Sequence, residues 1–234
     1  MSIFVIADLH LSFKTNKPMG IFGPNWVCHE EKIADSWREQ VKKDDLVVLP
    51  GDFSWAMNLE ETIQDFEYLT QLPGKKLLLK GNHDYWWTTL AKMRKFLEEH
   101  KFENIDFIQN NYYLEQNKLL VGTHGWIINN KEEDMRLLRR EKLRIQMQLD
   151  AIKEKYTDRK EIIVFMHYPP YEKKDGKIIN PYSEIFENYK IKTCYYGHLH
   201  GEKAYGDIKD FEYNGVTYRL VSADYLNFKP LKIL

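Results

Sequence analysis

Five apolar runs of this sequence are each followed directly by polar side chains that can bind a metal ion. The runs are residues 3–7, 46–49, 77–79, 162–166 and 191–196. The polar groups after them are, in chain order, Asp8, His10, Asp52, Asn82, His83, Asp84, His167, His198 and His200. Imidazoles together with carboxylates and one amide oxygen suit Mn, Fe, Co, Ni or Zn better than Mg or Ca, which prefer shells made only of oxygen. The pattern predicts a transition-metal site.

The number of groups indicates more than one ion. With His83 and Asp84 set aside, seven groups remain, which is too many for one first-row ion that keeps an open catalytic position. Two ions about 3.5–4 Å apart, bridged by a carboxylate, can clamp both the attacking and the leaving oxygen of an in-line displacement. Two divalent ions against two carboxylates leave a surplus of positive charge, which favours an anionic substrate and lowers the pKa of a bound water.

The elements that must position these groups are short buried strands. Residues 77–79 lie between Gly74 and Gly81 and are too few for a helix, so they are typical of a buried parallel strand. In open α/β sheets, ligands bind at the carboxyl ends of such strands. Because strand side chains alternate, we expect Asp8 and His10 to point to the same face.

The segments between the runs complete an α/β pattern. Helical spacing of apolar residues predicts helices around residues 33–41, 57–72, 88–99 and 132–156. Three short strand candidates between residues 107 and 121 indicate an antiparallel stretch, and Asn214-Gly215 between aromatic residues predicts a hairpin over residues 211–218. Residues 11–28 predict a long loop, and long loops in compact domains are usually functional or mobile.

The motifs taken together resemble those of the calcineurin-like metallophosphoesterase superfamily. They are Asp8-x-His10, Gly51-Asp52, Gly81-Asn82-His83-Asp84, His167 and Gly197-His198-x-His200, and they span most of the chain. Each motif alone is weak, but five in this order, each after a strand, form a strong signal. The resemblance implies a single metallophosphoesterase domain over residues 1–234. It also implies a four-layer α/β/β/α sandwich, with two mixed central β-sheets flanked by helices.

The resemblance also implies a role for each residue. It assigns Asp8, His10 and His200 to one metal ion, and Asn82, His167 and His198 to the other. Asp52 would bind both ions, of which Mn is the first expectation and Fe, Zn, Ni or Co are alternatives, divalent or trivalent. Asn82 and His83 would contact the substrate.

The implied reaction is attack of a metal-bridging hydroxide on the phosphorus of a phosphomonoester or phosphodiester. His83 would not bind metal. It would be oriented by Asp84, kept cationic, and act as the general acid for the leaving oxygen.

Departures from the family pattern reduce the range of activities that the resemblance implies. The branch of Ser/Thr protein phosphatases carries Asp-Arg-Gly shortly after the second motif, whereas Phe53-Ser54-Trp55 stands here, and Asp84 stands where that branch has Glu. The chain looks more like the phosphodiesterases and small-molecule phosphohydrolases. A nuclease and a catalytically silent metal-bound scaffold are the alternatives. The pair His83 and Asp84 argues against the scaffold.

Composition restricts partners and location. Thirty-four basic and thirty-five acidic side chains leave a net charge of −1, which argues against a protein that binds nucleic acid mainly through its phosphates. Only Cys28 and Cys194 occur, so a disulfide framework is not expected and a reducing cytoplasm is the default location. No apolar stretch approaches the ~18 residues of a membrane helix. We therefore expect a soluble enzyme with a small phosphoester substrate.

Some residues are weaker candidates. His124, between two glycines, is a substrate-binding candidate, although a local structural role fits its neighbours better. Trp55, Trp86 and Trp87 follow metal motifs and could stack on a substrate ring, but packing beneath the loops is the preferred reading. The charged positions of the helix at 132–156 are expected to form a solvated face rather than a binding surface for a partner or nucleic acid.

Overall fold

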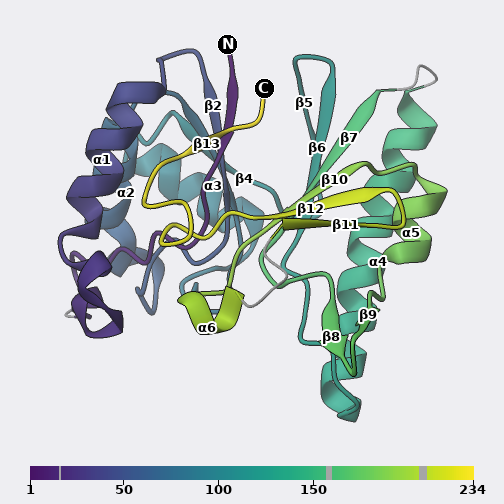
Figure 1. The fold of residues 1–234 in the computed structure, drawn as a ribbon. Coiled ribbons are helices and arrows are strands. Elements are labelled where there is room, and N and C mark those ends of the chain that lie inside the picture. Colours follow the sequence, from purple (N-terminus) through teal and green to yellow (C-terminus); the bar gives the residue numbers. More distant parts are fainter. Residues whose placement is uncertain (16, 157–159, 206–209) are drawn as a thin grey trace.

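The computed structural model describes residues 1–15, 17–156, 160–205 and 210–234. Two β-sheets lie face to face between two layers of helices, so the predicted mixed α/β architecture with two central sheets is confirmed (Figure 1). A third, two-stranded sheet forms a separate hairpin.

The first sheet has the strand order β13-β1-β2-β3-β4. Strands β1 to β4 are mutually parallel, and β13 pairs antiparallel with β1. The strands are β1 Ile3–Val5, β2 Leu46–Pro50, β3 Lys75–Leu79, β4 Ile105–Phe107 and β13 Leu231–Lys232. Because β1, β2 and β3 run in the same direction, the residues that follow them meet at one edge of the sheet.

The second sheet has the order β11-β12-β10-β7-β6-β5. Its four central strands are parallel, and both edge strands are antiparallel. The strands are β5 Tyr113–Glu115, β6 Lys118–Thr123, β7 Glu161–Met166, β10 Thr193–Tyr196, β11 Asp210–Tyr213 and β12 Val216–Leu220. The small sheet is the hairpin of β8 Glu172–Lys174 and β9 Lys177–Ile179.

Helices cover the outer face of each large sheet (Figure 1). The first sheet is covered by α1 His29–Gln40, α2 Ile63–Gln71 and α3 Leu90–Glu99, and the second by α4 Glu132–Lys155 and α5 Ser183–Asn188. The short helices are α6 Glu202–Tyr205 and the 3₁₀ helices Met19–Phe22, Pro24–Trp26 and Leu59–Thr62. None of the described helices has the length and apolar character needed to cross a membrane.

Three apolar clusters hold the layers together. One joins the first sheet to its helices and includes Phe66, the second joins the other sheet to α4 and α5 and includes Leu149, and the third fills the space between the sheets. In the third cluster Val48 of β2 and Leu79 of β3 share the interior with Phe165 of β7. This inner layer is the reason why the strands read as continuous apolar runs, since they are buried on both faces.

Several details differ from the sequence-based expectation. β4 is not part of an antiparallel stretch but a parallel edge strand of the first sheet, and only β5 and β6 form the expected hairpin. The loop at residues 11–28 contains two 3₁₀ helices, and its Met19 and Trp26 are buried. The β8–β9 hairpin was missed, although Asp175-Gly176 at its turn is a known hairpin signal.

The charged face of α4 is also less uniform than expected. Glu141 is almost fully buried and accepts a hydrogen bond from the Thr123 hydroxyl at 2.7 Å. Arg144 and Arg140 pair with the same carboxylate at 2.7 and 3.2 Å. These two arginines are therefore paired at the helix surface. Arg136, Arg139 and Arg140 are exposed, as predicted.

Candidate metal centre

The candidate ligands come from both large sheets. Asp8, Asp52 and Asn82 follow β1, β2 and β3 of the first sheet, while His167 and the pair His198 and His200 follow β7 and β10 of the second. All five strands end at the same side of the sandwich, and the two sheets bring groups 192 positions apart in the sequence into contact, as from Asp8 to His200. The structure thus gathers the predicted groups in one place.

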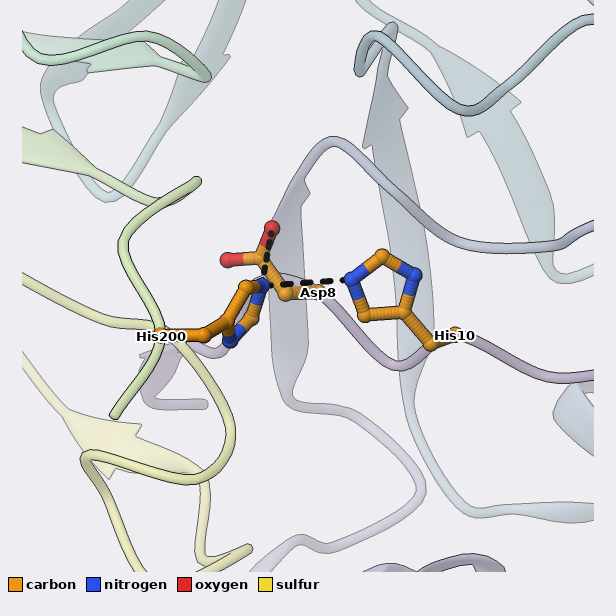
Figure 2. Close-up of side chains that lie close together, drawn as sticks. All are labelled: Asp8, His10 and His200. Atoms are coloured by element: carbon orange, nitrogen blue, oxygen red, sulfur yellow. Dashed lines mark hydrogen bonds and ion pairs between the residues drawn. The ribbon is translucent and has the colours of Figure 1, made fainter. Parts of the chain in front are cut away.

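Asp8, His10 and His200 form a first group, as Figure 2 shows. The Nε2 atoms of His10 and His200 are 3.2 Å apart, and the His200 Nε2 is 3.6 Å from the Asp8 Oδ1. Atoms bound about 2.1 Å from one ion lie about 3.0–3.4 Å from each other in octahedral or tetrahedral geometry. The spacing in this group is therefore close to what one bound ion requires.

Asn82, His167 and His198 form a second group. The Asn82 Oδ1 lies 2.7 Å from the His167 Nε2 and 2.9 Å from the His198 Nδ1. One amide oxygen thus sits between two imidazole nitrogens, an arrangement that a cation would hold together.

The Asp52 carboxylate lies between the two groups. Its Oδ2 is 3.7 Å from the His10 Nε2 and 3.5 Å from the His167 Nε2, and the side chain is 1% exposed. Its Oδ1 accepts a hydrogen bond from the His83 backbone N–H at 2.8 Å. Oδ2 is therefore the oxygen directed toward both groups, which is the position that a bridging ligand requires.

Close backbone approach explains two of the glycines. A Cβ atom on Gly81 would lie 2.1 Å from the Asp52 Oδ1, and one on Gly197 would lie 2.5 Å from the Asp8 Oδ2. Any side chain at these positions would displace the carboxylates. The glycines are thus required by contact with the candidate ligands rather than by turn geometry alone.

Four candidate ligands have backbone angles that L-residues rarely adopt. The φ values are 61° for Asp8, 48° for His10, 52° for Asp52 and 73° for His198. The first strand ends at Val5, so the expectation that strand alternation aims Asp8 and His10 is wrong. Their side chains converge because the chain turns left-handed at both residues. Such angles cost about 1–3 kcal/mol each and cluster at functional sites.

The Asp84 side chain stabilises the backbone of the loops that carry Asp52 and Asn82. Its buried carboxylate accepts hydrogen bonds from the backbone N–H groups of Asp52, Phe53, Ser54 and Gly81, at 2.7–3.2 Å, and from the Trp86 indole at 3.0 Å. It therefore ties the loop after β2 to the loop after β3.

Asp84 does not hydrogen-bond to the His83 imidazole, although the predicted orientation of His83 by Asp84 would require it. The His83 Nδ1 is buried and has no hydrogen-bond partner among the described residues, so Asp84 does not hold the imidazole directly. Its Nε2 lies 4.0 Å from the Asp52 Oδ2, and its side chain is 33% exposed. Burial is the main cause that lowers the pKa of His83, and the nearby His167 lowers it further. This contradicts the expectation that the surroundings of His83 keep its imidazole cationic.

Burial favours the neutral, metal-binding form of two of the candidate imidazoles. Burial lowers the pKa of His10 and, with His167 nearby, brings that of His198 to about 3, so both imidazoles are neutral near pH 7. Burial and the charge of Asp8 raise the pKa of Asp52. Neutral imidazoles and crowded buried carboxylates are the donors that a cation stabilises.

Two imidazoles are oriented by acceptors behind them. The His167 Nδ1 lies 3.1 Å from the Pro50 carbonyl oxygen, and the His200 Nδ1 lies 2.9 Å from the Asp224 Oδ1. A proton on each Nδ1 leaves the lone pair of Nε2 free for a metal ion. Although burial opposes it, the charges of Asp8 and Asp224 raise the pKa of His200 to about 10.

Asp224 was not predicted from the sequence. Besides His200 it binds the Gly201 N–H at 2.9 Å and the Tyr205 hydroxyl at 2.5 Å, and it is buried. A signal was present, since Asp224 follows β12 as the predicted ligands follow their strands.

Replacing Asp224 with asparagine is expected to weaken metal binding by about 10–100-fold, since partners of this kind orient the ligand and raise its basicity. Titration of metal-free protein with Mn²⁺ measures the change, with Asp35→Asn on the exposed face of α1 as the matched control. Equal affinity in both variants would mean that Asp224 only fixes the Gly201–Tyr205 turn.

His124 lies behind the second group. Its ring stacks on that of His167 with centroids 5.7 Å apart and planes 2° apart, and its Nε2 is buried without a partner in the described part of the chain. It borders a cavity of about 200 Å³ together with Lys80 and Arg144, a different cavity from the one beside His83. Its role in substrate binding remains a prediction.

Comparison with known proteins agrees with the fold and the motifs. A family model described as calcineurin-like phosphoesterase matches residues 1–202. The gene 66 protein of Mycobacterium phage D29 is 32% identical over 84 residues, which are 36% of this chain and 40% of that protein. The gene 66 protein of phage L5 is 31% identical over 78 residues, 33% and 37% of the two chains. The chain thus spans about two fifths of the length of these curated relatives.

Solved structures are similar over nearly the whole chain. A phosphopantetheinyl hydrolase from Mycobacterium tuberculosis has a TM-score of 0.58 at 15% identity, covering 100% of this chain and 95% of that one. A protein of unknown function from Aquifex aeolicus has a TM-score of 0.51 at 17% identity, covering 99% and 95%. The protein TT1561 of Thermus thermophilus has a TM-score of 0.56 at 14% identity, covering 93% and 87%. At these identities the likeness extends to the fold alone.

Proposed function

Since the chain belongs to the calcineurin-like phosphoesterase family, we propose that it is a hydrolase that uses a pair of metal ions to cleave phosphomonoesters or phosphodiesters. The observation that carries the proposal is the position of Asp52, whose Oδ2 faces His10 of one ligand group and His167 of the other. A lone structural ion would not need a buried carboxylate between two complete sets of donors.

The donor set supports two cations at neighbouring positions. Asp8, His10 and His200 would hold one, Asn82, His167 and His198 the other, and Asp52 both. When bound, the ions would act as Lewis acids toward the phosphoryl oxygens and lower the pKa of water. Mn fits this mixture of imidazole and oxygen donors, as do Fe, Zn, Ni and Co.

The remaining steps belong to the chain's own side chains. His83 does not lie within either ligand group, yet its Nε2 is 4.0 Å from the Asp52 Oδ2 and its ring is one-third exposed. It would therefore lie beside a phosphate bound at the metal centre, where its protonated form would give a proton to the leaving oxygen. Asn82 would contact the substrate as well as the metal.

The two alternatives are weaker. A nuclease would need basic side chains to follow the backbone of its substrate, and the chain has no excess of basic residues. A silent scaffold would have no use for an unligated His83 beside the centre. The phosphopantetheinyl hydrolase that shares the fold makes a small organic phosphoester the first kind of substrate to test.

The proposal is tested on chelated protein to which Mn²⁺ is added back. We expect about two ions per chain, and hydrolysis of p-nitrophenyl phosphate, its bis-ester or its phosphonate analogue only after metal is restored. Bound metal should also raise the melting temperature by mass action. Two bound ions without turnover on any ester would support the scaffold, and salt-dependent affinity for DNA or RNA would support the nuclease.

A further inference from the structure

A cavity of about 240 Å³ opens beside the candidate metal centre on the side of His83. Its floor is formed by the imidazoles of His10, His83 and His200. Its walls are apolar and come from the loop at residues 11–28 and from the loop after β2: Met19, Phe22, Trp26 and Trp55. Among the described residues that line it, none carries a carboxylate, ammonium or guanidinium group.

The walls are fixed by packing rather than by substrate. Trp55 stacks on His10 with centroids 5.0 Å apart and lies 4.3 Å from the His83 ring, while its indole N–H points at the Met19 sulfur at 3.3 Å. Trp26 is 3% exposed and packs edge-on against His10 and His200, at 5.9 and 5.5 Å. The cavity is therefore formed before any ligand enters it.

We infer that this cavity binds the leaving group of the substrate, and that this group carries an apolar ring. The inference rests on the proposed function, because it follows from the place of the general acid. A general acid must lie within about 2.6–3.2 Å of the oxygen that it protonates. If His83 protonates the leaving oxygen, the rest of that group must occupy the space around His83, and this space has aromatic walls.

The aromatic walls of the cavity favour a leaving group with an apolar ring. Aromatic side chains favour flat apolar partners, with which they pack edge-to-face or offset. A highly hydroxylated leaving group would lose its hydration there, and the three imidazoles are the polar side chains among the described residues that line the cavity. The cavity beside His124 differs, because charged side chains are among its lining residues: Lys80, Arg140, Arg144 and Glu141.

The rim of the cavity offers a position for a test. Phe22 is 62% exposed and lines the cavity, whereas its neighbour Ile21 in the same 3₁₀ helix is 76% exposed and does not. Neither side chain is part of the core, so both can be replaced by alanine without loss of folding. Phe22→Ala and Ile21→Ala are thus matched variants that differ in contact with the cavity.

The kinetic test uses two phosphoesters whose leaving alcohols have similar acidity, 2-naphthylmethyl phosphate and 2-methoxyethyl phosphate, each also as its methyl diester. We expect the wild-type protein with Mn²⁺ to prefer the naphthylmethyl ester of whichever type it cleaves. Phe22→Ala should lower kcat/KM for that ester about tenfold, mainly through KM, because contacts of this size in a hydrophobic pocket change discrimination by about tenfold or more. Ile21→Ala should change kcat/KM for neither ester, and Phe22→Ala should lower kcat/KM for the methoxyethyl ester less than for the naphthylmethyl ester.

A binding test separates this inference from the proposed function. Binding of 2-naphthylmethanol to the Mn²⁺-loaded protein, followed by quenching of tryptophan fluorescence, should be weaker in Phe22→Ala than in Ile21→Ala. Equal hydrolysis of both esters, with no binding of the alcohol, would overturn the inference while leaving the hydrolase intact. Binding of the alcohol without hydrolysis of any ester would overturn the proposed function and leave an aromatic-ligand pocket.

Discussion

Asp52→Asn is expected to reduce bound metal from two ions to one ion per chain or fewer and to lower kcat/KM by about 10³-fold or more. Asparagine keeps an oxygen that can accept the His83 N–H, so the loop can retain its shape. What disappears is the negative charge of Oδ2, which lies 3.7 Å from the His10 Nε2 and 3.5 Å from the His167 Nε2. Loss of one metal's charge stabilisation is worth several kcal/mol, each 1.36 kcal/mol of which is about tenfold in rate.

Elemental analysis of the dialysed protein, together with steady-state kinetics, measures both effects. Asp106→Asn is the matched control, because this carboxylate pairs with Arg94 at the surface, far along the sheet from the centre. Two ions retained in Asp52→Asn at wild-type affinity would show that the carboxylate does not bridge them.

His83→Ala is expected to leave the metal content unchanged and to lower kcat by about 10²-fold or more on esters with poor leaving groups, the range of lost general acid catalysis. The loss should shrink on p-nitrophenyl esters, because p-nitrophenolate leaves without a proton. The decline of kcat/KM with rising pH should weaken as well, since the protonated acid is the active form. Because burial lowers the pKa of His83 from its usual value of 6.5, that decline is expected below pH 6.5 in the wild-type protein.

His100→Ala, at the exposed end of α3, controls for the removal of an imidazole. Kinetics of His83→Ala on alkyl and p-nitrophenyl esters then decide the role. A loss of equal size on both esters would assign His83 to phosphate binding rather than to proton transfer.

The sequence predicts the placement of the ligands better than their immediate surroundings. Apolar runs that end at Asp8, Asp52, Asn82 and His167 are enough to locate strand ends, and parallel strands bring their ends together. The left-handed turns at Asp8 and His10 could not be anticipated, because neither residue is a glycine. Their angles depend on contacts with other segments, such as the bond from the His10 N–H to the Asp52 carbonyl at 3.0 Å.

Long-range partners account for the other differences. Asp84 was expected to serve its neighbour His83, but its carboxylate is directed to N–H groups about 30 positions away, after β2. Asp224 lies 24 positions after His200, in a segment without a motif. The cavity walls, too, combine residues 19–26 with Trp55, a pairing that local patterns do not reveal.

The side chains that join the two large sheets change in character along the strands, and this should affect how the sandwich responds to metal removal. Toward the core, apolar side chains such as Val48 and Phe165 join the sheets, but at the carboxyl ends of the strands the facing groups are imidazoles, carboxylates and an amide. Ions at that edge would cross-link segments that are far apart in the sequence, such as those of Asp8 and His200. Chelation should therefore loosen the loops at the carboxyl ends of the strands first. Hydrogen exchange after metal removal would then accelerate in the loops after β1, β7 and β10 while the amides of the strands stay protected.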